Sequence, residues 1–145
     1  MNYLLDTNIL LRTIDLKHPL NQDTTKAVER LRLANHLLYI VPQNLLEAWN
    51  VCTRPLDKNG LGMSVDQTDI EIKRLETLFI LLPDSPAIYP QWRTLVKQYN
   101  VKGVNVHDTR IVAAMLVHEI SHLLTFNVED FKRFIEITIV HPNDI

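Results

Sequence analysis

The feature that most constrains the fold is a series of short apolar runs separated by longer stretches with helical spacing. The first run, Tyr3 to Leu5, shows no polar alternation, which is typical of a strand buried on both faces of a parallel sheet. Later runs of similar length and character are Leu37 to Val41, Phe79 to Leu82, Leu123 to Phe126 and Ile137 to Val140. The sequence therefore predicts about five strands.

Helical patterns fill the intervals between these predicted strands. Ser64 and Gln67 have the spacing of a capping box, and Ser85-Pro86 resembles an N-cap followed by proline. The stretch Ile111 to Val117 has no polar residue, which predicts a central helix buried on most sides. The expected helices are Asp23 to Asn35, Pro42 to Arg54, Ser64 onward, Ser85 to Tyr99, His107 onward and Val128 to Phe134.

Strands that alternate with helices in this way predict a three-layer α/β/α fold. We expect a mostly parallel central sheet with right-handed crossovers, and one helix between the first two strands. The length of 145 residues fits one domain, residues 1–145, with a core large enough to be stable without disulfides or a structural metal.

Composition limits the class of protein further. Cys52 is the only cysteine, which excludes an internal disulfide and a multi-cysteine zinc site and fits a reducing, cytoplasmic compartment. The apolar runs are too short to cross a bilayer, so we expect no membrane association. The formal charge of -2 argues against a general polyanion binder, although lysines and arginines cluster locally.

Four polar residues fall where strands end or helices begin. Asp6 follows the first predicted strand, Glu47 lies in the helix after the second, Asp108 precedes the apolar helix, and Asn127 follows the fourth strand. Taken singly, Asp6 and Asp108 fit helix caps, Glu47 a solvated helix residue and Asn127 a turn. Taken together, all four can converge on the carboxyl edge of the sheet. Carboxylates that meet repel one another unless a cation is present, and oxygen ligands favour Mg²⁺ or Mn²⁺.

Four segments resemble those of a known family, the PIN domain, named for the PilT N-terminus. They read Leu-Leu-Asp-Thr-Asn-Ile-Leu-Leu, Val-Pro-Gln-Asn-Leu-Leu-Glu-Ala-Trp, Val-His-Asp and Leu-Leu-Thr-Phe-Asn-Val-Glu-Asp-Phe. The resemblance covers nearly the whole chain and keeps the order and approximate spacing of the family. The short chain is most similar to the virulence-associated protein C type of toxin ribonuclease.

This resemblance implies an Mg²⁺- or Mn²⁺-dependent endoribonuclease, with Asp6, Glu47 and Asp108 as catalytic and metal-binding residues. Thr7 or Asn8 would support Asp6. The fourth acidic position of the family aligns with Asn127, which puts a second metal in doubt, although Asp130 lies one short-helix turn away and could partly substitute.

The resemblance also implies partners. Toxins of this type are usually homodimers held inactive by a small antitoxin, and the helices from Pro42 to Leu78 could supply the groove for it. The substrate would be RNA, whose backbone Arg12 and Arg110 could hold unless both are ordinary surface charge.

Other residue types allow further interpretations. His107, His118 and His122 could act in acid–base chemistry, but the apolar helix nearby favours packing or capping. Trp49 and Trp92 fit the core or an interface better than a stacking platform.

Two different functions stay open. A strand-terminal Asp6 could be the nucleophile of a phosphotransferase, but such a site needs a second acid close by and position 8 is Asn. The chain could also be a catalytically weakened module of the same fold that binds RNA or a protein without cleaving, which Asn127 keeps possible.

Overall fold

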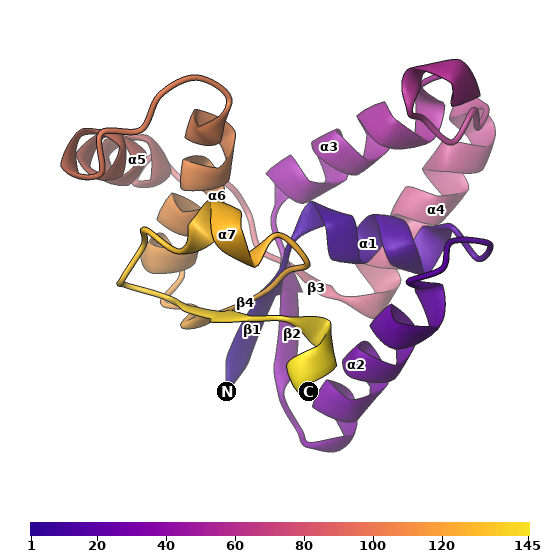
Figure 1. Cartoon of the computed structure of the whole chain (residues 1–145), viewed down its shortest axis with the longest axis horizontal. Coiled ribbons are helices and arrows are strands. Elements are labelled where there is room, and N and C mark those ends of the chain that lie inside the picture. The colour runs from indigo at the N-terminus through magenta and orange to yellow at the C-terminus, as the bar shows by residue number, and fades with distance from the viewer.

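A computed structural model describes all 145 residues and shows a five-stranded sheet between two groups of helices (Figure 1). The strands are β1 (Asn2–Leu5), β2 (Leu37–Ile40), β3 (Ile80–Leu81), β4 (His122–Leu124) and β5 (Thr138–Val140). Their order across the sheet is β3-β2-β1-β4-β5, and every neighbouring pair is parallel. The predicted α/β/α architecture is confirmed, with β1 in the middle of the sheet.

The helices divide between the two faces of the sheet (Figure 1). One face carries α1 (Thr7–Ile14), α2 (Asn21–Leu33), α3 (Pro42–Thr53) and α4 (Val65–Leu78). The other carries α5 (Ile88–Gln98), α6 (Asn105–Val117) and α7 (Val128–Phe131). None of these helices is both long and apolar enough to cross a membrane.

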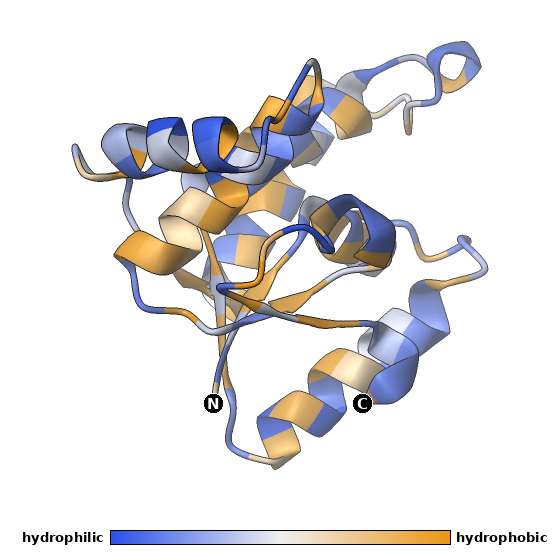
Figure 2. Cartoon of the chain, turned by 60° about the vertical axis from the view of Figure 1, so that its left-hand side comes forward, coloured by the Kyte–Doolittle hydropathy of each residue, from blue (hydrophilic) through white to orange (hydrophobic).

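Two hydrophobic cores follow from the alternation of side chains along β1. Tyr3 and Leu5 face the core shared with α1 to α4, whereas Leu4 faces the core shared with α5 to α7. In Figure 2 the strands carry mostly hydrophobic colours, while the helices carry both colours. Residues 111–115 of α6 are all buried, which confirms the prediction of a buried apolar helix.

Several predicted elements are corrected by the structure. The strand predicted at Phe79 to Leu82 is present, but it is shorter and not buried: β3 has two residues, both exposed, at the edge of the sheet. Ser85 does not cap a helix: α5 begins at Ile88, and the Ser85 hydroxyl accepts the Ala87 N–H at 3.1 Å. The capping box of Ser64 and Gln67 at the start of α4 is confirmed.

The connection between β1 and β2 contains two helices where the sequence predicted one. The apolar residues that follow Asp6 form a helix of their own, α1, immediately after β1. This early turn into a helix brings the residues after Asp6 back onto the sheet and fixes the region in which polar side chains gather.

Candidate functional site

Asp6 lies at the carboxyl end of the central strand. Its N–H donates to Leu124 O at 3.0 Å, which continues the pairing of Leu5 with Leu124 in β4. The parallel register therefore places Asp6 beside Thr125, although 119 residues separate them in the chain. Asp6 has only 6% of its surface exposed, so its carboxylate depends on protein partners.

Three hydrogen bonds hold the Asp6 carboxylate. Oδ1 accepts the Thr7 N–H at 2.8 Å, which caps α1. Oδ2 accepts the Thr125 hydroxyl at 2.6 Å and the Asn8 side-chain amide at 3.3 Å. Asp6 is thus both a helix cap and a member of the polar cluster, so the two interpretations of this residue do not exclude each other.

Glu47 reaches the same region from α3. Its Oε2 accepts the Thr7 hydroxyl at 2.9 Å, and its Oε1 accepts the Gln43 side-chain amide at 2.7 Å. The same Gln43 amide donates to His107 O at 2.8 Å, which ties α3 to α6. Glu47 is therefore a fixed carboxylate, which corrects the alternative of a solvated helix residue.

Asp108 lies in the first turn of α6, where Val104 holds the N-cap position, so the interpretation of Asp108 as a helix cap is wrong. Burial, reinforced by the negative charges of Asp6, Asp130 and Glu47, raises the pKa of Asp108 to about 7. Arg133 alone lowers this pKa, and no hydrogen bond opposes the rise.

Burial also raises the pKa of Asp6, to about 6. The hydrogen bonds from Thr125 and Thr7 oppose this rise, whereas the charges of Glu47 and Asp130 add to it. The carboxylates of Asp6, which follows β1, and of residues in α3, α6 and α7 therefore interact electrostatically at the carboxyl edge of the sheet. Their mutual repulsion is a cost that a bound cation would relieve.

Of the two residues predicted after the fourth strand, Asp130 and not Asn127 adds a negative charge that acts on Asp6 and Asp108. Asn127 is exposed, its side chain makes no capping hydrogen bond, and its N–H donates to the Thr125 hydroxyl at 2.9 Å. No three acidic, histidine or cysteine side chains stand close enough together to enclose a metal ion. The donor set is nonetheless oxygen-only, as hard cations require.

Sequence reasoning missed Thr125 and Gln43. Thr125 is fully buried, donates to Asp6 and also accepts from Asn127, so it organises the loop after β4. Its position directly after a strand was a usable signal. Gln43 gave no such signal, because its role depends on the approach of α6 to α3.

The two predicted arginines have different surroundings. Arg110 donates to Gln43 Oε1 at 3.2 Å and to Asp84 Oδ1 at 3.3 Å, so it borders the carboxylates through Gln43. Arg12 lies in the last turn of α1, at the opposite end of that helix from Asp6, and its Nε is buried without a partner.

Two of the predicted histidines have partners other than the carboxylates. His118 follows α6 and its Nε2 contacts Pro83 O at 2.9 Å, and His122 opens β4 against the ring of Tyr3. The ring of His107 makes no hydrogen bond to the carboxylates, although its carbonyl accepts from Gln43.

The two tryptophans pack against the two cores, as predicted. Trp49 contacts the core of α1 to α4, and Trp92 contacts the core of α5 to α7. The Trp92 indole N–H also donates to Val106 O at 2.8 Å, which anchors α5 to the start of α6.

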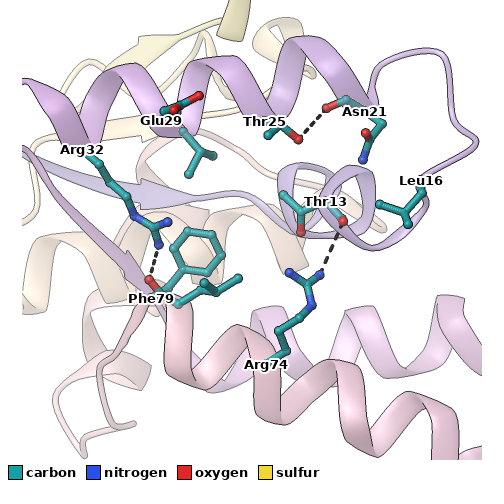
Figure 3. Close-up of a pocket in the computed structure, with 10 residues that line it drawn as sticks. Thr13, Leu16, Asn21, Thr25, Glu29, Arg32, Arg74 and Phe79 are labelled. Atoms are coloured by element: carbon teal, nitrogen blue, oxygen red, sulfur yellow. Dashed lines mark hydrogen bonds between the residues drawn. The ribbon is translucent and has the colours of Figure 1, made fainter.

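A pocket of about 510 Å³ lies elsewhere, between the end of α1, α2 and α4 (Figure 3). In this view Arg74 reaches Thr13 O, and Arg32 lies against Phe79, with its guanidinium carbon 5.1 Å from the ring centre. None of the predicted site residues lines this pocket. This pocket and the acidic site are therefore different places.

The sequence of residues 3–136 matches the model of the PIN domain family. The chain belongs to the PIN domain family. A comparison with curated proteins finds no match. Three solved structures have a similar fold. Each is less than 25% identical to this PIN domain, so the similarity concerns the fold alone.

A chain in the structure of VapBC2 from Rickettsia felis bound to a DNA fragment from its promoter has a TM-score of 0.72 at 21% identity. That match covers 97% of this PIN domain and 98% of the other chain. VapBC-1 from nontypeable Haemophilus influenzae gives a TM-score of 0.70 at 19% identity and covers 99% of each chain. VapC20 of Mycobacterium tuberculosis, a toxin that cleaves the sarcin-ricin loop, gives 0.66 at 12% identity over 93% of this chain and 98% of its own.

Proposed function

We propose that this PIN domain is a divalent-metal-dependent endoribonuclease and the toxin of a toxin–antitoxin pair. One observation carries the nuclease proposal: Asp6, Glu47, Asp108 and Asp130 come from different elements, and burial, with a smaller contribution from their negative charges, raises the pKa values of Asp6 and Asp108. A fold does not benefit from gathering like charges, whereas a cation site requires it. Family membership and the similar fold of the toxin VapC20 add support.

The residues fit Mg²⁺ or Mn²⁺ in their chemistry. All the candidate ligand atoms are carboxylate or amide oxygens, and the Asp108 carboxylate has no hydrogen bond that a cation would have to displace. Asp6 and Asp108 would hold the ion, and Glu47 would bind a second ion or position the water, because no three of these side chains stand close enough together to enclose one ion. When bound, the ion supplies Lewis-acid stabilisation of the scissile phosphate and activation of a water.

The chain itself would position the reactants. Glu47, held by Thr7 and Gln43, would orient the water that attacks the phosphorus as the bond to the leaving sugar oxygen breaks. Thr125 and Thr7 keep Asp6 oriented toward the site. Arg110, fixed by Gln43, is placed to bind the RNA backbone beside the carboxylates.

Partners form the second part of the proposal. A similar fold occurs in a toxin–antitoxin complex from Klebsiella pneumoniae, and α3 and α4 expose apolar side chains that a partner could cover. We propose a homodimer and an inhibitory antitoxin protein, in the cytoplasm. The exposed Asn127 continues to support the alternative of a module that binds RNA without cleaving it.

RNA cleavage tests the nuclease proposal directly. We expect the purified protein to cleave single-stranded RNA with Mg²⁺ or Mn²⁺, and Asp6→Asn or Asp108→Asn to lower the rate at least 100-fold, since each removes a charge from the site. Gel analysis of a labelled RNA with metal and with excess chelator measures this.

The matched control is Asp23→Asn, an exposed carboxylate on α2, which should cleave at the parent rate. Full activity in excess chelator would contradict metal dependence. Binding without cleavage would favour the weakened module, and a labile phosphate on Asp6 would favour the phosphotransferase.

A further inference from the structure

A second pocket is lined by Arg110 and by residues that have no role in the chemistry described above. It has a volume of about 320 Å³, and its lining residues are Ser85, Pro86, Ile88, Tyr89, Trp92 and Arg110. Arg110 connects it to the acidic site, because the guanidinium that lines the pocket also donates to Gln43, and Gln43 donates to Glu47. A ligand in this pocket would therefore lie one side chain away from the Glu47–Gln43 pair.

The pocket presents an aromatic platform. The rings of Tyr89 and Trp92 stack with centres 5.9 Å apart and an angle of 27° between their planes. Trp92 is fixed, because its indole N–H donates to Val106 O and its ring packs against the core of α5 to α7. Tyr89, in contrast, is 63% exposed. An exposed ring supported by a fixed ring offers a flat face that a base can stack on.

Positive charge continues from this platform along α5. A neighbouring hollow of about 420 Å³ is lined by Tyr89, Pro90, Arg93, Thr94 and Lys97. Tyr89, Arg93 and Lys97 are four residues apart in turn, so they share one face of α5 at steps of about 6 Å. Asp84 precedes the lining residue Ser85 in the chain, and its carboxylate is paired with Arg110 at 3.3 Å.

We infer that this pocket is a stacking site for an unpaired base of single-stranded RNA, with Arg93 and Lys97 holding the backbone beyond it. The inference rests on the proposed nuclease function and adds the site at which its single-stranded substrate is held. Aromatic rings recognise bases that are splayed out of a strand, whereas the bases of a duplex are already stacked on each other. The cationic surroundings favour a nucleic acid over an apolar protein partner.

Tyr89→Ala tests the platform, because the exposed ring can be removed without opening the core. We expect its Kd for a fluorescein-labelled single-stranded RNA to rise about 10-fold, while Tyr89→Phe keeps the ring and the parent affinity. Fluorescence anisotropy in chelator, with Asp108→Asn in every protein, measures binding without requiring cleavage.

An abasic site moved along the RNA locates the stacked base. At one position, the abasic RNA should bind the parent about 10-fold more weakly than intact RNA does. Tyr89→Ala should bind the two RNAs equally, because the variant has already lost the ring that the missing base would stack on. Lys97→Gln should weaken binding and reduce the slope of log K against log salt concentration by about 1. Lys26→Gln, an exposed lysine on α2, should leave both unchanged.

The possible outcomes separate the two proposals. Loss of RNA affinity in Tyr89→Ala supports the stacking site even if the parent cleaves nothing, in which case the nuclease proposal fails alone. RNA cleavage and binding at parent levels in Tyr89→Ala overturn the stacking site and leave the nuclease proposal intact. If Tyr89→Ala instead separates a dimer and keeps the RNA affinity, the platform is a protein interface and our inference is wrong.

Discussion

Asp108 faces three carboxylates and has no hydrogen bond to the protein, so its ionised form is costly in the metal-free fold. A carboxyl group with a raised pKa in the folded state contributes stability at pH values below its ordinary pKa of about 4. That contribution is lost as the pH rises through the folded pKa, which is about 6 for Asp6 and about 7 for Asp108. As the pH rises from 5 to 8, ionisation of these two groups therefore lowers the free energy of unfolding.

Replacing Asp108 by Asn removes one of these charges and keeps the shape of the side chain. In chelator at pH 8 we expect the variant to be more stable than the parent by about 1 kcal/mol or more, since one pKa unit corresponds to about 1.4 kcal/mol. At pH 5, where the parent Asp108 is protonated, the difference should shrink. Urea unfolding at the two pH values measures it.

Mg²⁺ provides the complementary measurement. It should raise the melting temperature of the parent and scarcely change that of Asp108→Asn, because a ligand stabilises only the state that binds it. Asp66→Asn, an exposed acidic residue in α4, should respond to Mg²⁺ as the parent does. Equal and metal-insensitive melting temperatures for parent and Asp108→Asn would remove the case for a metal site at these residues.

At the scale of elements, the site depends on the register between β1 and β4. Leu5 pairs with Leu124, and the next residue on each strand, Asp6 and Thr125, meet through a hydrogen bond of 2.6 Å. Thr125 also accepts from the Asn127 N–H and, at 3.4 Å, from the Asn8 amide. One buried hydroxyl thus joins the ends of two strands to the loops that follow them.

Thr125→Val should break this junction with little change in volume. We expect a loss of about 1–3 kcal/mol in the free energy of unfolding, because Asp6 and the Asn127 N–H lose a buried partner. The loss should be larger at pH 8 than at pH 5, since the Thr125 hydroxyl stabilises the ionised form of Asp6. Chemical unfolding at both pH values measures this, and Thr125→Ser, which keeps the hydroxyl, should lose less and show a smaller pH effect.

The same elements show how far the sequence could be interpreted. Buried strands such as β1 were predictable, because both of their faces need apolar side chains. The two-residue β3 was misjudged, because apolar residues at a sheet edge look the same in sequence as those in its centre. Asp6 and Glu47 were found at strand and helix positions, but Gln43 was not, since its contacts depend on how α3 and α6 approach each other.

At the scale of the molecule, α3, α4 and the loop between them leave large apolar side chains uncovered. Leu46, Leu56, Val65 and Ile70 are each more than 60% exposed. A partner that packed on these helices would remove these apolar side chains from water. They are consistent with the proposed dimer and antitoxin, and they lie on the helices from Pro42 to Leu78 that the sequence indicated.

We therefore expect the protein expressed alone to be a dimer at micromolar concentration and to slow the growth of its host. Asp108→Asn should form the same dimer and leave growth unaffected, since it lacks only the cleaving site. Light scattering after size exclusion and growth curves on induction measure the two effects. A monomer that does not affect growth would contradict the toxin assignment but not the nuclease assignment.

The pairing of β1 with β4 also orders events during synthesis. Asp6, Glu47 and Asp108 leave the ribosome before Thr125 and Asp130, and β1 has no neighbour on its β4 side until the last quarter of the chain emerges. A nascent chain thus carries three of the four carboxylates of the candidate site while the strand next to Asp6 is still missing. The candidate site is therefore incomplete during most of synthesis, and it becomes complete only when the strand of residues 122–124 pairs with β1.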